Sequence, residues 1–175
     1  MSDDLRYPIG KFARDPHVDA AKRAAWILQI AEAPAMFAAA VHGLDDAQLD
    51  TPYRPGGWTV RQVAHHVPDS HMNAYIRCKL AVTEDNPPVK TYEEAAWAEQ
   101  ADARMMPIAA SITLLRVLHE RWVTWLRALD EPAFARTAVH PEWGRMRVDD
   151  FLQLYAWHGR HHTAHVIALR KRMGW

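Results

Sequence analysis

Histidine is concentrated in two short stretches of this sequence, and its side chains are the ones whose type and spacing could do chemistry. Of the 175 residues 11 are histidine, and seven of these fall in two clusters. The clusters contain His65, His66 and His71, and then His158, His161, His162 and His165. Neutral imidazole is a common ligand of zinc and a frequent proton carrier. The clusters could therefore form a metal site, a proton relay or a histidine-rich helix face.

Cysteine usage restricts which side chains could hold a metal ion. Cys78 is the only cysteine, so the chain cannot form an internal disulfide bond or a cysteine-based zinc site. Histidine and carboxylate side chains would have to supply the ligands. We interpret Cys78 as a small buried apolar residue, because the sequence shows no basic partner that would activate its thiol.

Helical phase separates the four histidines of the second cluster. With about 100° between successive residues, His158 and His162 fall in the middle of the apolar stripe of a predicted helix over 149–172. His165 lies nearer the edge of this stripe, and His161 faces the flank or solvent. His158 and His162 are therefore the pair that we expect to point into the protein.

A third ligand would have to come from another helix. Two histidines four residues apart can bind one ion, as in the H-E-x-x-H motif, although its glutamate is absent here. His66 borders the apolar side of the preceding histidine-bearing helix more closely than His65, although Pro68 could shift the phase beyond it. We therefore predict one metal ion bound by His66, His158 and His162. A network of histidines and water is the alternative that the spacing leaves open.

Composition favours a single folded domain over residues 1–175. The 21 basic and 21 acidic side chains give a net charge of zero, which argues against nucleic acid and membrane surfaces as partners and favours a small molecule. The first residues, MSDDLRYPIGKF, lack the pattern of a secretory signal. No apolar run approaches the roughly 20 residues that span a bilayer, so we expect a cytoplasmic protein.

Hydrophobic periodicity predicts an all-α fold. The predicted helices cover residues 18–42, 60–82, 107–129 and 149–172. No segment has the alternation of a β-strand. Thr59 and Gln62 have the spacing of a capping box, while Pro107 and Asp149 are expected to begin the third and fourth helices. Pro34 is expected to kink the first helix.

The predicted helices are joined by three long segments. These are residues 43–58, 83–106 and 130–147. Loops of such length in a small bundle are usually functional or disordered, and we expect these to be ordered and to cover the metal-site end. On the second helix, Ser70, Asn73 and Arg77 form a polar stripe. This stripe could bind substrate or could simply face solvent.

Six sequence motifs occur in an order that is typical of a known family. They are RYPIGKF, DTPYRPGGWTVRQVAHHVPDSHMNAYIRCKL, LHERW, HPEWG, YAWHGRHHTAH and the terminal RMGW. With these motifs the chain resembles the YfiT-like branch of the DinB-like superfamily, and the resemblance covers nearly its whole length.

The resemblance implies a four-helix bundle, usually a homodimer, that holds one divalent metal ion per chain. Zn²⁺ is the expected ion and Ni²⁺ the alternative. The family's ligand positions match His66, His158 and His162, which are the residues that helical phase selects independently. Members of the family are described as metal-dependent hydrolases, and relatives are S-transferases for the low-molecular-weight thiol bacillithiol.

Three neutral imidazoles leave a coordination position open, which is typical of catalytic zinc. Metal-bound water then has a pKa of about 7, and a thiol bound there would be ionised likewise. The site could therefore belong to a hydrolase that uses metal-bound water, or to an S-transferase that joins a thiol to an electrophile. A non-catalytic metal-binding bundle is the third hypothesis. A hydrolase would need a carboxylate to move protons, for which Asp69 and Glu142 are candidates.

Overall fold

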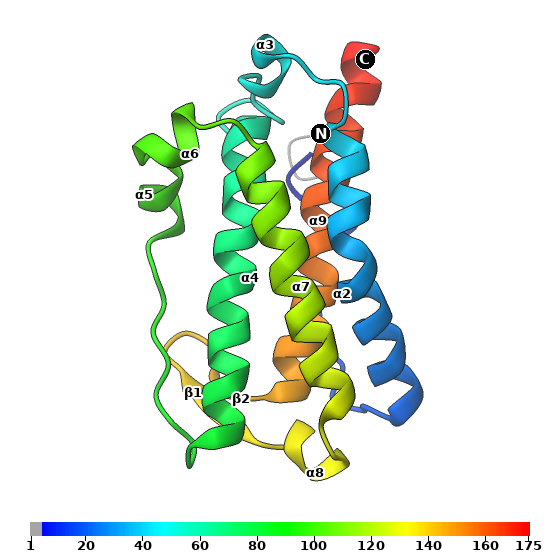
Figure 1. Ribbon diagram of the computed structural model, residues 1–175, viewed down its shortest axis with the longest axis vertical. Coiled ribbons are helices and arrows are strands. Elements are labelled where there is room, and N and C mark those ends of the chain that lie inside the picture. The colour runs from blue at the N-terminus through cyan, green and yellow to red at the C-terminus, as the bar shows by residue number, and fades with distance from the viewer. Residues whose placement is uncertain (1–4) are drawn as a thin grey trace.

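Four long helices form the body of the molecule (Figure 1). The computed structural model describes residues 5–175, so the first four residues of the segment considered for a secretory signal lie outside it. The long helices are α2 (Ala20–Val41), α4 (Val60–Thr83), α7 (Ala109–Ala128) and α9 (Val148–Met173). They coincide with the four predicted segments within a few residues, so the prediction of an all-α four-helix bundle is confirmed.

The directions of the four long helices require one connection that spans the length of the bundle. α2 and α4 each pack against both α7 and α9. α2 and α9 run in one direction along the bundle, whereas α4 and α7 run in the other (Figure 1). The chain between α4 and α7 therefore has to travel the length of the bundle, and it carries the short helices α5 (Glu94–Ala98) and α6 (Ala101–Met105).

The helix starts confirm one sequence prediction and correct two. Thr59 and Gln62 form the predicted capping box of α4. α9, however, begins one residue before Asp149, with Arg147 as its cap. Asp149 lies in the first turn, where its buried carboxylate accepts two hydrogen bonds from Arg23. α7 begins at Ala109, so Pro107 lies just outside the helix that it was expected to start.

Prolines lie inside two of the long helices, and both helices continue past them. Pro68 does not interrupt α4, which keeps its phase to Thr83. Pro34 lies within α2 as predicted. Since proline has no backbone N–H, the carbonyl four residues earlier loses its helical partner. In α2 that carbonyl belongs to Ile30, and its oxygen lies 2.6 Å from Nδ1 of His119 on α7.

The expectation that no strand forms is wrong. β1 (Thr137–His140) and β2 (Gly144–Arg147) form an antiparallel hairpin before α9. Strands of four residues are too short for alternation to emerge from the sequence. The other short helices are α3 (Asp46–Leu49) and α8 (Glu131–Phe134). They lie at opposite ends of the bundle (Figure 1), so the long connections do not share one end as expected.

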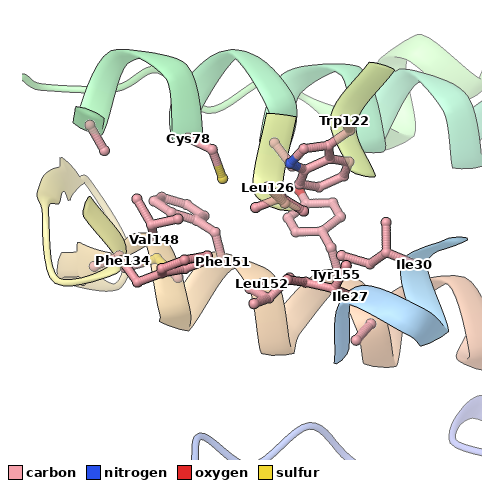
Figure 2. Close-up of a cluster of buried hydrophobic side chains, with 14 of the residues drawn as sticks. Ile27, Ile30, Cys78, Trp122, Leu126, Phe134, Val148, Phe151, Leu152 and Tyr155 are labelled. Atoms are coloured by element: carbon pink, nitrogen blue, oxygen red, sulfur yellow. The ribbon is translucent and has the colours of Figure 1, made fainter. Parts of the chain in front are cut away.

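The apolar core consists of two clusters of buried side chains. The cluster in Figure 2 includes Ile27, Ile30, Cys78, Trp122, Leu126, Phe151, Leu152 and Tyr155. The second includes Phe37, Val60, Val63, Leu115, Val166 and Leu169. On α7 and α9 the histidines His119, His158 and His162 fall between the residues of the two clusters. We call the histidines of this region the imidazole layer: His66, His71, His119, His158, His162 and His165.

α2 is also long and apolar enough to cross a membrane by length and composition alone, with an 18-residue window of mean hydropathy 1.5. The sequence analysis overlooked this window. Such a helix is weak evidence for a membrane span, because a core helix passes the same test. Here α2 packs against α7 and α9, and its Ile27, Ile30 and Phe37 belong to the core.

Gly159 on α9 allows α2 to approach closely, which gives a test of the packing. A Cβ atom at this position would lie 3.1 Å from Cβ of Ala33 and 3.6 Å from Cε1 of His71. We expect Gly159→Val to lower the free energy of unfolding by about 1–3 kcal/mol, as overpacked cores do. Urea denaturation would measure the loss, and unchanged stability would contradict the packing. As the matched control, a double-mutant cycle with Ala33→Gly should show a coupling of about 0.5–3 kcal/mol.

Candidate metal centre

The three predicted ligands lie together between α4 and α9. His66, His158 and His162 each offer a ring nitrogen, and these nitrogens all lie within 4.8 Å of one another. Their ring centroids are 4.5 to 5.3 Å apart. His66 and His162 are buried, and His158 is partly exposed. The arrangement fits a divalent ion of intermediate softness such as zinc, which prefers imidazole nitrogen to oxygen ligands.

The environment keeps these rings neutral at pH 7. Burial lowers the pKa of His66 to about 4. Burial, followed by the neighbouring histidines, also holds the pKa values of His158 and His162 well below the ordinary value. Because a proton and a metal ion compete for the same lone pair, the low pKa values leave the nitrogens available to a metal.

The neighbouring His65 is not part of the cluster. Its Nδ1 lies 2.7 Å from the Ser111 hydroxyl, and its Nε2 lies 3.1 Å from the Met106 carbonyl oxygen. Both nitrogens are therefore engaged away from the ligands. The choice of His66 from the pair by helical phase agrees with this geometry.

Two cavities meet at the ligands, with volumes of about 370 and 410 Å³. The hairpin-side cavity is lined by Ser70, Arg77, Thr91, Tyr92, Glu93, Glu94, His140, Glu142, Trp143, Leu154, Tyr155 and His158. The N-terminal-side cavity is lined by Arg6, Tyr7, Tyr53, Arg54, Gly56, Gly57, Trp58, His66, Glu94, Trp157, His158, His161, His162 and His165. His158 and Glu94 belong to both. Although the three long connections lie at different ends, each contributes to these walls.

The predicted polar stripe on α4 is only partly directed toward the ligands. Ser70 and Arg77 line the hairpin-side cavity. The Ser70 hydroxyl lies 3.4 Å from that of Tyr155, and the Arg77 guanidinium donates to the Lys90 carbonyl. Asn73 lines neither cavity; its amide donates to the Asp69 carbonyl one turn earlier.

The carboxylates near the ligands differ from those chosen from the sequence. Glu142 lines the hairpin-side cavity, but Asp69 lines neither, and its pKa is raised to about 6 by burial and by Asp102. Glu94, which the sequence analysis missed, lines both cavities. Burial raises its pKa, and the negative charge of Glu142 adds to the effect. It begins the five-residue helix α5 within a long connection, and so short a helix left no periodic signal that could have identified it.

His161 and His165 lie on the flank of α9, but both are buried, which corrects the expectation that this face could be open to solvent. The His161 ring stacks on Trp157 at a centroid distance of 4.3 Å. The His165 ring stacks on Tyr53 at 4.0 Å, and its Nε2 lies 3.0 Å from the Arg6 carbonyl oxygen. The N-terminal segment and the loop before α4 therefore cover this flank of α9, a contact that helical phase cannot reveal.

Comparison with known proteins gives matches over nearly the whole chain. Residues 29–166 match the family model described as the DinB superfamily. Relatives from Bacillus cereus (strain 03BB102) and Bacillus thuringiensis subsp. konkukian (strain 97-27), each named "Putative metal-dependent hydrolase", are 50% identical over 173 residues. The matches cover 99% of this chain and 99% of each relative.

Two solved structures share the fold. YfiT from Bacillus subtilis, described as a probable metal-dependent hydrolase with an unusual four-helix bundle topology, is 44% identical and has a TM-score of 0.96. The match covers 98% of this chain and 99% of that one. TT2238, described as a four-helix bundle protein, is 19% identical with a TM-score of 0.56, over 87% of this chain and 99% of its own. This second likeness concerns the fold alone.

The buried imidazoles predict a strong pH dependence of stability in metal-free protein. Burial lowers the pKa of His119 to about 4, whereas an unfolded histidine titrates at about 6.5. Between these values the unfolded chain binds a proton that the folded chain does not bind, so the free energy of unfolding falls as the pH falls. Each such histidine contributes up to about 1.4 kcal/mol per pH unit.

We expect urea denaturation in the presence of a chelator to show this loss between pH 6.5 and 4.5. His119→Gln, which removes one titrating ring, should give a shallower slope than the unmodified chain. A stability that stays flat over this range would contradict the burial of neutral histidines.

Proposed function

The chain is a YfiT-like member of the DinB superfamily, and on this basis we propose that it is a metal-dependent hydrolase whose ion is held by His66, His158 and His162. The observation that carries the proposal is the convergence of three neutral imidazoles beside two cavities. The names of the relatives point to the same class of enzyme.

The chemistry of the donor set supports a catalytic ion rather than a structural one. Structural zinc sites usually have four protein ligands, whereas catalytic sites have three. A divalent ion such as Zn²⁺ or Ni²⁺ held by three imidazoles supplies Lewis acidity and lowers the pKa of a bound water or thiol. His158 is partly exposed and lines both cavities, so a small molecule in either cavity would lie beside a ligand.

Glu94 is the carboxylate best placed to accept a proton during hydrolysis. It lines both cavities, and its raised pKa lies closer to neutral pH than the pKa of an ordinary glutamate does. A general base is most effective when its pKa lies near the working pH. Burial is the main cause of this shift, and the charge of Glu142, which lines the same hairpin-side cavity, adds to it.

The cavity walls support a substrate with distinct polar groups. Glu93, Glu94 and Glu142 give the hairpin-side cavity an acidic character, with Arg77 as the basic residue of that wall. The N-terminal-side cavity combines aromatic rings with Arg6 and Arg54. A small molecule that carries a hydrogen-bonding or cationic group at one end and an anionic group at the other would complement both walls.

Thiol transfer is the second candidate, and the presence of two cavities at one ligand favours it. A low-molecular-weight thiol in one cavity and an electrophile in the other would both lie beside His158. The thiol would come from outside the chain, because Cys78 is fully buried and burial raises the pKa of its thiol well above the ordinary value. In such an enzyme no general base needs to activate water.

Metal content tests the ligand assignment. We expect purified protein to bind about one divalent ion per chain, and His158→Ala to lose most of it, because two imidazoles alone bind zinc weakly. His42→Ala, at an exposed position after α2, is the matched control and should keep the ion. Elemental analysis after dialysis would measure both. Equal occupancy in His158→Ala and the control would refute the assignment.

The reaction type can be tested with the metal-loaded protein. We expect cleavage within a panel of esters and amides, and we expect Glu94→Gln to lower kcat by about 10²–10⁴-fold while leaving metal content unchanged. Glu84→Gln, an exposed residue at the end of α4, should behave as the unmodified chain. Conjugation of a thiol such as bacillithiol to an electrophile without ester cleavage would favour the transferase. Activity in neither assay would favour a non-catalytic bundle.

A further inference from the structure

The imidazole layer contains three histidines that do not belong to the proposed ligand set. His71, His119 and His165 are buried, and each lies within hydrogen-bonding distance of another histidine of the layer. They form two chains of hydrogen bonds that run from backbone carbonyls to the ligands. We call these the long chain and the short chain.

The long chain begins at the Ile30 carbonyl and ends at His158. The Ile30 oxygen lies 2.6 Å from His119 Nδ1. His119 Nε2 lies 2.8 Å from His71 Nδ1, and His71 Nε2 lies 3.1 Å from His158 Nδ1. Each of these contacts needs one hydrogen between its two heavy atoms.

The carbonyl determines where the hydrogens of the long chain lie. Because a carbonyl oxygen can only accept, His119 must carry its proton on Nδ1, which leaves Nε2 as an acceptor. His71 must then donate from Nδ1 and accept at Nε2, and His158 must donate from Nδ1. The remaining nitrogen of His158 is Nε2, which is left unprotonated with its lone pair available to an ion.

The short chain imposes the same arrangement on the second ligand of α9. The Arg6 carbonyl oxygen lies 3.0 Å from His165 Nε2, so His165 donates there and accepts at Nδ1. His165 Nδ1 lies 3.4 Å from His162 Nδ1. His162 therefore donates from Nδ1, and its Nε2 is left as the free acceptor.

The environment of the two chains keeps their rings neutral, which supports this single arrangement of protons on the ring nitrogens. Burial is the main cause that lowers the pKa values of His71, His119 and His165. Over residues 5–175, no carboxylate forms a hydrogen bond to any ring of the two chains. A ring that carried both protons would place an uncompensated charge in the core, which is costly.

Pro34 accounts for the starting point of the long chain. Without a backbone N–H at position 34, the Ile30 carbonyl has no donor from its own helix. A buried carbonyl that lacks a donor costs free energy, and His119 on α7 supplies one. The backbone break at the helix proline and the proposed ligand His158 are thus connected through two imidazoles, those of His119 and His71.

We propose that His71, His119 and His165 are positioning residues that fix His158 and His162 in the Nδ1–H tautomer, so that the Nε2 atoms of both face the ion before it binds. This inference rests on the proposed function for the identity of the ligands. Hydrogen bonds to the second nitrogen of a ligand histidine fix its tautomer and orientation and make it a better ligand. Here that function is performed by other histidines rather than by carboxylates.

Tautomers in the metal-free protein provide the direct test. Nitrogen-15 NMR of the histidine side chains should show His158 and His162 protonated at Nδ1 and unprotonated at Nε2, with His165 protonated at Nε2. This measurement requires neither metal nor activity. Protonation of His158 or His162 at Nε2 would overturn the proposal, even if the metal site itself were correct.

Substitution at the far end of the long chain provides the second test, because His119 does not touch the proposed ion. In His119→Phe, His71 loses its acceptor and is free to carry its proton on Nε2, which would direct the proton of His158 to its ligand atom. We expect affinity for Zn²⁺ in competition with a chelator to fall about 10- to 100-fold. In His119→Gln the side-chain carbonyl oxygen can still accept from His71 Nδ1. This variant should therefore keep most of the Zn²⁺ affinity that His119→Phe loses.

A matched control separates tautomer control from general damage to the layer. Leu115→Ala removes a buried side chain one turn before His119 on α7, and this residue belongs to neither chain and lines neither cavity. It should keep the Zn²⁺ affinity of the unmodified chain. Equal losses in His119→Phe, His119→Gln and Leu115→Ala would show that the effect is only structural. A chain that binds no Zn²⁺ at all would refute the proposed function, while the NMR result would still decide the tautomers.

Discussion

A buried imidazole nitrogen costs free energy unless it has a hydrogen-bond partner or an ion, and this cost shapes the centre of the bundle. The six rings of the imidazole layer lie between two clusters of mainly apolar side chains. Both nitrogens of His71, His119 and His165 are engaged, as are the Nδ1 atoms of His158 and His162. The nitrogens that remain are Nε2 of His158, Nε2 of His162 and those of His66, and a single ion would bind one nitrogen from each of these three rings.

The topology of the bundle determines which acidic side chains line the cavities beside these rings. Because α4 and α7 are parallel, the chain between them runs along the side of the bundle and brings Glu94 to the ligands (Figure 1). The hairpin contributes Glu142 from the other direction. Rigid helices thus hold the ligands, and the connections supply the groups that surround a substrate, which is a common division in enzymes.

The sequence predicted the features that depend on local periodicity. The helices, the α4 capping box and the inward direction of His158 and His162 follow from side-chain spacing along a single helix. Contacts between distant segments left no such signal. The cover over His161 and His165 comes from residues near the N-terminus and before α4, and Glu94 begins the five-residue helix α5, which is too short to show a period. Asp149 failed as a cap because Arg147 precedes the helix and its backbone N–H donates to Asp150, whereas Asp149 pairs with Arg23 on α2.

Pro34 also affects the axial register of α2 against α7. Much of α2 is alanine, and small, similar side chains make a smooth helix surface on which neighbouring registers differ little in packing energy. A shift of α2 by one turn along α7 would retain many apolar contacts, but it would separate the Ile30 oxygen from His119. Both groups would then be buried without a partner, which is costly. The missing N–H of Pro34 therefore helps to set the axial register of α2 against α7, which apolar packing alone would specify only weakly.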